Sequence, residues 1–220
     1  MTGSHIVGRD TAVQAAPSWT AVAARAASLL LRYPDEEVLS ALGVLTDALA
    51  GLPPEVAEPL RRTAAHRSTV APATLAAEYV QLFDFRRRCC LYLTYYTCGD
   101  TRQRGEALVR FAEAFRLAGY RVADGELPDY LPAVLDLAAA EGELGWRLLR
   151  DNRVGLDLLV QALAAEQSPY RHAVEAVRAM LPPPDPADLA AAARLVRTGP
   201  PVEQVGLEPF GLVDTVGGRR

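Results

Sequence analysis

The sequence predicts an all-α fold, a single helical bundle followed by a proline-rich linker and an irregular C-terminal tail. The chain has 220 residues, of which 50% are hydrophobic, so one domain can bury a sizeable core. The apolar residues are chiefly Ala and Leu, which are strong helix formers, and Ile6 is the single isoleucine. Because strands favour β-branched and aromatic residues, an all-β or a parallel α/β fold is strongly disfavoured.

Three regions follow from the composition along the chain. Residues 1–17 are polar and mixed, and we expect a flexible N-terminus there. Residues 18–198 carry the helical spacing and are expected to form the folded domain. Residues 199–220 are rich in Gly, Pro and Val without a sustained period, which predicts an extended or mobile tail.

The first helices are predicted from their caps and prolines. Ser18 is expected to cap a helix that ends at Pro34, and Asp35 to cap a second one. The two prolines at residues 53–54 are expected to end the second helix and to begin a short third one. Another helix is expected to start at Pro72. The inward positions of the first two helices are Val22, Ala26, Leu29, Leu30 and Tyr33, then Leu39, Leu42, Leu45, Leu49 and Leu52.

The later helices show the same apolar spacing. The residues from Asp100 to Gln103 form a capping-box pattern with Asp100 as the acceptor, ahead of a helix that Gly119 ends. Its apolar stripe consists of Leu108, Phe111, Phe115 and Ala118. Further helices are predicted from Tyr130 to Glu141, from Leu156 to Glu166, from Tyr170 to Leu181 and, after the linker at 182–186, from Ala187 to Arg197.

Composition also excludes several classes of function. All 23 basic residues are Arg, which removes any mechanism that needs a lysine, and the three histidines are scattered. No nucleophile elbow, P-loop or dinucleotide-binding fingerprint occurs, so we predict that the chain is not an enzyme. The net charge of −4 argues against binding of nucleic acid. No apolar run is long enough to span a membrane and no signal peptide is recognisable, so we predict a cytoplasmic protein.

The three cysteines, Cys89, Cys90 and Cys98, do not predict a metal site. Their spacing matches no zinc ribbon or finger, and no histidine lies nearby in the sequence. Small buried apolar side chains are the favoured interpretation, and a redox or cluster role is the alternative. We therefore predict no metal and no cofactor.

Charges and aromatic residues gather in neighbouring segments. Residues 124–143 contain six acidic residues and no Arg, whereas residues 86–116 contain seven Arg and three acidic residues. On composition alone, ordinary solvated faces are the favoured explanation of both segments, and a groove that holds a charged peptide is the alternative. The most aromatic stretch, residues 79–96, is interpreted as core or as the wall of a partly hydrated groove.

Four motifs occur in a fixed order: residues 30–35 (LLRYPD), 79–84 (YVQLFD), 99–105 (GDTRQRG) and 126–132 (ELPDYLP). Over roughly residues 20–180 the chain resembles the NarJ-type assembly chaperones of respiratory nitrate reductase, also called its delta subunit. The resemblance implies a TorD-like all-helical fold and a non-enzymatic chaperone. Such chaperones bind the N-terminal segment of the catalytic alpha subunit, support insertion of the molybdenum cofactor and delay membrane docking. The resemblance does not require the chaperone to hold molybdenum.

Ten side chains are predicted to form the peptide groove. The aromatic ones are expected to meet the apolar side of a peptide helix, and the acidic ones its basic residues. For Asp100, Arg102 and Arg104 a structural role at the helix start is the strong alternative. The ten candidates are Tyr79, Phe83, Asp84, Tyr92, Tyr95, Asp100, Arg102, Arg104, Glu126 and Asp129.

Two other interpretations stay open at this point. A chaperone of the same class could serve a different molybdoenzyme. A helical ligand-binding regulatory domain, with the tail as its effector arm, is the alternative from another class. The sequence predicts neither nucleic-acid binding nor direct membrane insertion for any of them.

Overall fold

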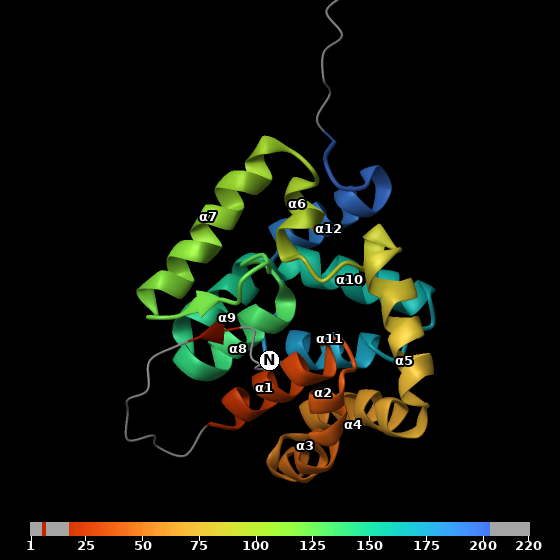
Figure 1. The fold of residues 1–220 in the computed structure, drawn as a ribbon. Helices are drawn as coiled ribbons and strands as arrows, with labels where there is room; N and C mark the ends of the chain where they lie inside the picture. The colour runs from red at the N-terminus through yellow and green to blue at the C-terminus, as the bar shows by residue number, and fades with distance from the viewer. Residues whose placement is uncertain (1–5, 8–17, 203–220) are drawn as a thin grey trace, which may run out of the picture.

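The computed structural model describes residues 6–7 and 18–202, and it is built almost entirely of helices (Figure 1). The predicted N-terminal region 1–17 and tail 199–220 thus lie mostly outside the described residues. The α-helices are α1 (Trp19–Leu30), α2 (Glu36–Ser40), α3 (Leu42–Ala48), α4 (Pro54–Thr69), α5 (Pro72–Tyr79), α6 (Leu93–Cys98), α7 (Arg102–Leu117), α8 (Leu131–Glu141), α9 (Glu143–Asp151), α10 (Arg153–Ala165), α11 (Arg171–Ala179) and α12 (Pro186–Thr198). The predicted all-α class is confirmed.

Short irregular elements complete the described fold. Two 3-10 turns lie at Leu49–Gly51 and Arg87–Cys89, and a π-helical turn at Val80–Asp84 extends α5. Strand β1 (Ile6–Val7) pairs antiparallel with β2 (Arg121–Val122). This small pair is the one sheet among the described residues.

The core lies where the stripes of α1, α4, α8, α10 and α11 meet. Helix α1 packs against α8, α11 and α4, and α11 packs in turn against α4 and α10. These helices present closely packed Ala, Leu and Val side chains, as the stripes predicted; Ala27, Leu30, Leu135 and Val174 are all fully buried. Figure 1 shows α1 near the centre, with α8 and α11 beside it and α7 and α12 farther out.

The predicted caps at Ser18 and Asp35 are confirmed. The Ser18 side chain accepts a hydrogen bond from the Ala21 N–H at 3.3 Å, and the Asp35 carboxylate accepts one from the Val38 N–H at 2.8 Å. Helix α12 also begins with a capping box, in which Asp185 and Asp188 each accept from the other's N–H. These caps fix where the chain turns around α1, α2 and α12.

Two expectations about helix lengths were wrong. The second predicted helix is divided into α2, α3 and a 3-10 turn, because the chain breaks at Ala41. The short third helix is α4, which has 16 residues. The buried face of α4 ends in a charged residue, Arg67, and Pro59 lies within the helix. The apolar spacing in the sequence therefore does not indicate the full length of α4.

Helix α9 was not predicted. Gly142, with φ of +51°, separates it from α8. Gly145 then lies so close to α8 that a Cβ atom there would stand 2.2 Å from the Ala138 nitrogen. This close approach requires glycine and packs α9 directly on α8.

The described helices include none whose length and hydropathy would allow it to cross a bilayer.

Candidate functional site

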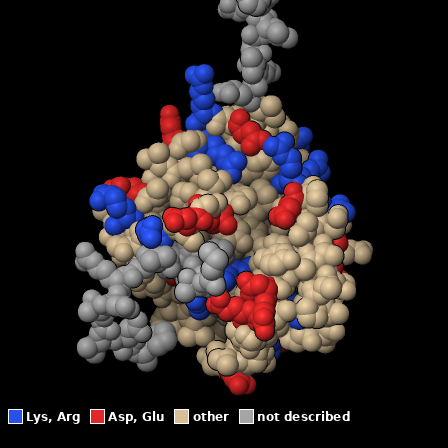
Figure 2. All heavy atoms as spheres, viewed as in Figure 1, with Lys and Arg blue, Asp and Glu red and all other residues tan. Residues whose placement is uncertain are grey.

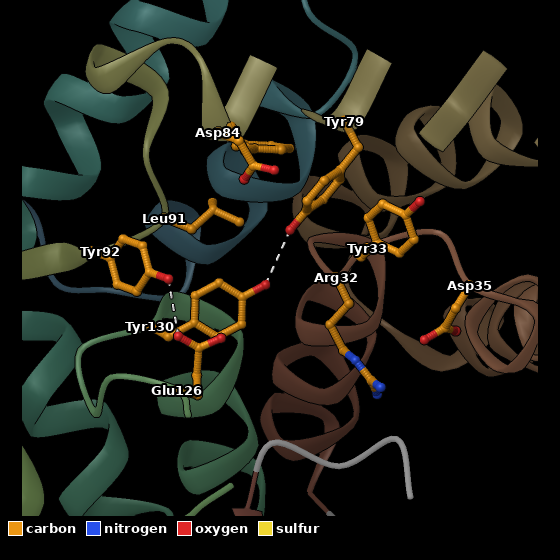
Figure 3. A pocket seen from close by; sticks show the side chains of 10 residues that line it. Arg32, Tyr33, Asp35, Tyr79, Asp84, Leu91, Tyr92, Glu126 and Tyr130 are labelled. Atoms are coloured by element: carbon orange, nitrogen blue, oxygen red, sulfur yellow. Dashed lines mark hydrogen bonds between the residues drawn. The ribbon is translucent and has the colours of Figure 1, made fainter. Parts of the chain in front are cut away.

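A pocket of about 290 Å³ opens at the C-terminal end of α1. Four chain segments, far apart in the sequence, bring their side chains together there, as Figure 3 shows. Its lining consists of Arg32, Tyr33, Asp35, Tyr79, Phe83, Asp84, Leu91, Tyr92, Glu126 and Tyr130. Five of these are among the ten predicted site residues: Tyr79, Phe83, Asp84, Tyr92 and Glu126.

The first segment, residues 31–35, is held by a buried arginine of α4. The Arg67 guanidinium donates to the carbonyl oxygens of Leu30 at 2.6 Å and of Arg32 at 2.9 Å. These carbonyls end α1 without a helical partner, so a buried cation satisfies them and also interacts favourably with the helix dipole. Burial lowers the pKa of Arg67 below its ordinary value. Arg67 thus sets the position from which Arg32 and Tyr33 reach the pocket.

The second segment is the π-helical turn after α5. Tyr79 donates its hydroxyl hydrogen to the Leu31 carbonyl at 3.0 Å, and its oxygen lies 3.1 Å from that of Tyr130. Burial is the main cause that raises the pKa of Tyr79 well above its ordinary value, and it raises the pKa of Tyr130 to about 12. Both hydroxyls therefore stay neutral and act as hydrogen-bonding groups.

Aromatic rings form the inner wall of the pocket. Tyr79 makes an edge contact with Tyr33, with 5.5 Å between ring centroids, and a tilted contact with Phe83 at 4.6 Å. Phe83 in turn contacts the buried Tyr170 edge-on at 5.2 Å. Such pairs stabilise one another beyond the area that they bury, so the wall is rigid.

The remaining two segments, residues 91–92 and 126–130, pair with each other. The Leu131 N–H donates to the Leu91 carbonyl at 2.8 Å, and the Leu93 N–H donates to the Asp129 carbonyl at 3.0 Å. Tyr92 consequently lies beside Tyr130, with 5.7 Å between ring centroids. Two loops that carry predicted site residues are joined in this way.

Glu126 lies at the rim of the pocket. Its Oε1 accepts from the Tyr92 hydroxyl at 3.1 Å and from the Leu127 N–H at 2.9 Å. Burial is the largest influence on its carboxylate and raises its pKa, while the two hydrogen bonds act in the opposite direction. Burial also raises the pKa of Tyr92. The lining thus holds three carboxylates, those of Asp35, Asp84 and Glu126, and one cation, Arg32.

A second pocket of about 310 Å³ adjoins the first and shares three of its residues, Phe83, Asp84 and Tyr92. Its other lining residues are Arg87, Cys90, Tyr95, Asp100 and Arg104. Tyr95, Asp100 and Arg104 were predicted site residues. Figure 2 shows acidic side chains around the middle of this face of the molecule and basic ones along its upper part.

Asp100 forms ion pairs with two arginines of the second pocket. It pairs with Arg87 across the mouth and, at 3.5 Å, with Arg104 four residues along the chain. The two guanidinium groups lie over Tyr95 and Tyr92, at 5.7 and 5.8 Å from the ring centroids. The predicted cap at Asp100 was wrong, because the chain enters α7 one residue later and Thr101 is the N-cap residue.

Two predicted site residues lie outside both pockets. Asp129 is fully buried: its Oδ2 accepts from the Thr94 N–H at 3.1 Å and from the Thr94 hydroxyl at 2.5 Å. It therefore holds the start of α6 and lines neither pocket. Arg102 is exposed on α7 and lines neither pocket.

The sequence did not predict seven residues of the two pockets as site residues: Arg32, Tyr33, Asp35, Leu91, Tyr130, Arg87 and Cys90. Arg32, Tyr33 and Asp35 belong to the first of the four ordered motifs, and Tyr130 belongs to the last. Membership of a motif was the available signal, because nothing in the local spacing brings the end of α1 next to residues 126–130.

The cysteines and histidines give no metal centre within the part of the chain that the structure describes. Cys89, Cys90 and Cys98 are free thiols, and burial raises the pKa of Cys89 and of Cys90 to about 11. Both thiols therefore stay protonated near neutral pH and react slowly. What the first pocket offers is an aromatic wall with neutral hydroxyls and an acidic rim, which suits binding of a segment with apolar and basic side chains.

Comparison with known proteins gives one family. The family model of the nitrate reductase delta subunit matches residues 49–176. The chain is 40% identical over 174 residues to the nitrate reductase-like protein NarX of Mycobacterium tuberculosis, an alignment that covers 79% of this chain and 26% of NarX. It is 32% identical over 170 residues to the probable nitrate reductase molybdenum cofactor assembly chaperone NarJ of Bacillus subtilis, covering 68% of this chain and 91% of that protein.

NarJ of Escherichia coli, the nitrate reductase molybdenum cofactor assembly chaperone, is 33% identical over 115 residues, 51% of this chain and 49% of NarJ. The crystal structure of a redox enzyme maturation protein from Archaeoglobus fulgidus has a TM-score of 0.54 at 23% identity, covering 78% of this chain and 98% of that one, and shares its fold. The chain thus spans about a quarter of NarX but nearly all of the Bacillus relative.

Proposed function

The chain belongs to the nitrate reductase delta subunit family, and from this premise we propose that it is the assembly chaperone of a respiratory nitrate reductase. In this role it binds the N-terminal segment of the catalytic subunit before that subunit is complete. It keeps the subunit competent for insertion of the molybdenum cofactor and delays its docking at the membrane. The chaperone acts in the cytoplasm and catalyses no reaction.

The observation that carries this proposal is the aromatic pocket with its acidic rim. Its aromatic rings offer an apolar surface to one side of a peptide helix, and Asp35, Asp84 and Glu126 offer carboxylates to basic residues beside that side. A relative in the same family supports this function. The Bacillus protein, which the chain covers almost completely, is named as an assembly chaperone and not as an enzyme.

The tyrosine side chains of the pocket are preorganised for binding a peptide. Tyr79 and Tyr130 hydrogen-bond each other, and Tyr92 is held by Glu126, so their rings lose little freedom on binding. A basic side chain that reaches Glu126 gains a charge-assisted hydrogen bond in a partly buried place. Both effects increase the affinity of the pocket for a short segment with a basic side chain.

The test is a calorimetric titration of the full chain with a peptide of about 15 residues from the N-terminus of the catalytic subunit, a length typical of such signal remnants. We expect Tyr92→Ala to weaken binding by at least about tenfold, as truncation of an aromatic anchor does. Glu126→Gln is expected to weaken it about fivefold, because one charge-assisted bond becomes neutral.

Glu143→Gln is the matched control, because Glu143 is an exposed carboxylate that pairs with Arg150 on α9, outside both pockets. We expect it to leave the affinity unchanged. Absence of heat with the peptide, together with no co-purification with the apo-subunit, would contradict the proposal. Tighter binding of a peptide from a different molybdoenzyme would assign the chaperone to that client.

A further inference from the structure

A third hollow, separate from the two pockets above, lies between α1, α3 and α8. It has a volume of about 540 Å³. Figure 1 shows α1 with α3 on one side and α8 on the other. The residues that line this α1–α3–α8 groove are Ala21, Val22, Arg25, Ala26, Leu29, Ala41, Val44, Leu45, Ala48, Asp136, Ala139 and Ala140.

Two apolar stripes make up most of the groove. On α1 the lining positions recur at three and four residues from Ala21 to Leu29, and on α3 they recur in the same way from Ala41 to Ala48. Val44 on the α3 stripe is 76% exposed, a large fraction for a valine beside other apolar residues. Stripes of small residues let another helix approach closely, with its own larger side chains between them.

A buried carboxylate of the groove lacks half of its hydrogen bonds. The side chain of Asp136 is 0% exposed, and its Oδ1 accepts from Arg25 at 2.5 Å. Its Oδ2 has no hydrogen-bond partner among the described residues. A buried carboxylate oxygen without a donor is unfavourable, so an occupant that brings a basic side chain gains affinity here.

The groove and the first pocket meet at the C-terminal end of α1. Leu29 lines the groove, and Arg32 and Tyr33, which follow the last helical residue Leu30, line the pocket. The Arg32 N–H donates to the Leu29 carbonyl at 3.4 Å, so the two linings are adjacent at this point. A segment bound in the pocket can therefore reach the groove past the end of α1.

We propose that the α1–α3–α8 groove binds the continuation of the client segment that occupies the aromatic pocket, as a short amphipathic helix with small or apolar contacts and one Lys or Arg directed at Asp136. This rests on the proposed function. From Ala21 to Leu29 the groove extends for about 12 Å, at 1.5 Å per helical residue, and takes about two turns of helix.

The test compares two peptides from the N-terminus of the catalytic subunit, of about 15 and about 30 residues. Each is titrated calorimetrically into the full chain. The longer peptide is expected to bind at least about tenfold more tightly, because it buries additional apolar side chains. Val44→Asp is expected to remove this gain and to leave the affinity for the shorter peptide unchanged.

Val109→Asp on α7 is the matched control: the same substitution at a valine that is 67% exposed and lines none of the three hollows. It should leave both affinities unchanged. Ala48→Glu, a second exposed position of the groove, should act as Val44→Asp does. Replacing each Lys or Arg of the added half of the peptide by Gln should identify one position that carries most of the gain.

Four outcomes overturn the inference. Equal affinities for the two peptides, or a gain that survives both groove substitutions, show that the groove is not used. A dimer of the wild-type chain that Val44→Asp dissociates shows that a second copy occupies it. Failure of the shorter peptide to bind removes the proposed function, and the inference falls with it.

Discussion

The helical core and the stretch between α5 and α7 are stabilised in different ways. In the core, α1, α8 and α11 bury long stripes of Ala, Leu and Val. Residues 80–101 contain a π-helical turn, a 3-10 turn and the six-residue α6. Here the Tyr96 hydroxyl lies 2.9 Å from the carbonyl oxygens of both Arg88 and Cys90, and the two oxygens share its single hydrogen.

The difference shows how this protein combines stability with a binding surface. Packing of regular stripes fills the core with apolar side chains, whereas the lining of the aromatic pocket comes mostly from turns and loops. The irregular stretch contributes to this lining because buried polar groups such as Asp129 and Tyr96 fix its backbone. We therefore expect core substitutions to alter stability alone, and substitutions of these polar groups to alter stability and peptide affinity together.

The largest effect on stability is expected from the core. Leu135→Ala removes a fully buried side chain from α8 and leaves a cavity, which should lower the free energy of unfolding by about 2–5 kcal/mol. Urea unfolding followed by circular dichroism measures this loss. The affinity of the folded fraction for the peptide should not change, and a tenfold loss of affinity would contradict the separation of the two regions.

Asp129→Asn should have the next largest effect. It weakens the two hydrogen bonds from Thr94 and removes a buried charge that lies 4.0 Å from Arg104, at an expected cost of about 1–3 kcal/mol. Because Asp129 holds the loop that carries Tyr92, peptide affinity should fall as well. Asp47→Asn, at an exposed carboxylate of α3, is the control and should change neither quantity.

Tyr79→Phe is expected to cost about 0.5–1.5 kcal/mol, the net value of a typical hydrogen bond, since the carbonyl of Leu31 loses its donor. The ring stays in place against Phe83, so the effect on peptide affinity should be only a few-fold. Tyr120→Phe, at a half-buried tyrosine after α7, is the matched variant. Equal effects of the two substitutions would show that the hydroxyl of Tyr79 does not hold the pocket.

The smallest effect is the pH dependence that comes from Glu126. Burial raises its pKa above the ordinary value of 4.5, so the folded chain binds its proton more tightly than the unfolded chain does. Its contribution to stability is therefore complete below the unfolded pKa and is lost as the pH rises through the folded one. A basic peptide residue favours the carboxylate, so peptide affinity should rise over the same window. Calorimetry at several pH values measures this slope, which should diminish in Glu126→Gln.

Much of the fold could be predicted because it depends on local signals. Ser18 and Asp35 cap their helices, and the stripe of Tyr170, Val174 and Val177 is buried as its spacing indicates. Where a local rule has a competitor, the prediction was wrong. Asp100 has the right spacing for a capping box, but Arg87 and Arg104 hold its carboxylate, and Thr101 becomes the N-cap residue.

The candidate site could be predicted in part, since aromatic and acidic residues gather in the sequence segments that form it. What the sequence does not indicate is burial within a loop. Glu126 and Asp129 are three residues apart, yet Glu126 lines the pocket, whereas Asp129 is fully buried and accepts a hydrogen bond from the Thr94 N–H. Likewise Arg32 and Tyr33 reach the pocket because Arg67, on another helix, holds the end of α1. Only tertiary structure supplies that contact.

The central claim is that the client peptide lies in the aromatic pocket, and amide hydrogen exchange of the full chain with and without the short peptide tests it most directly. The claim predicts slower exchange in residues 32–35, 79–84, 91–96 and 126–131, the segments that line or support the pocket. Slower exchange confined to α7 or α12, with these four segments unchanged, would contradict it.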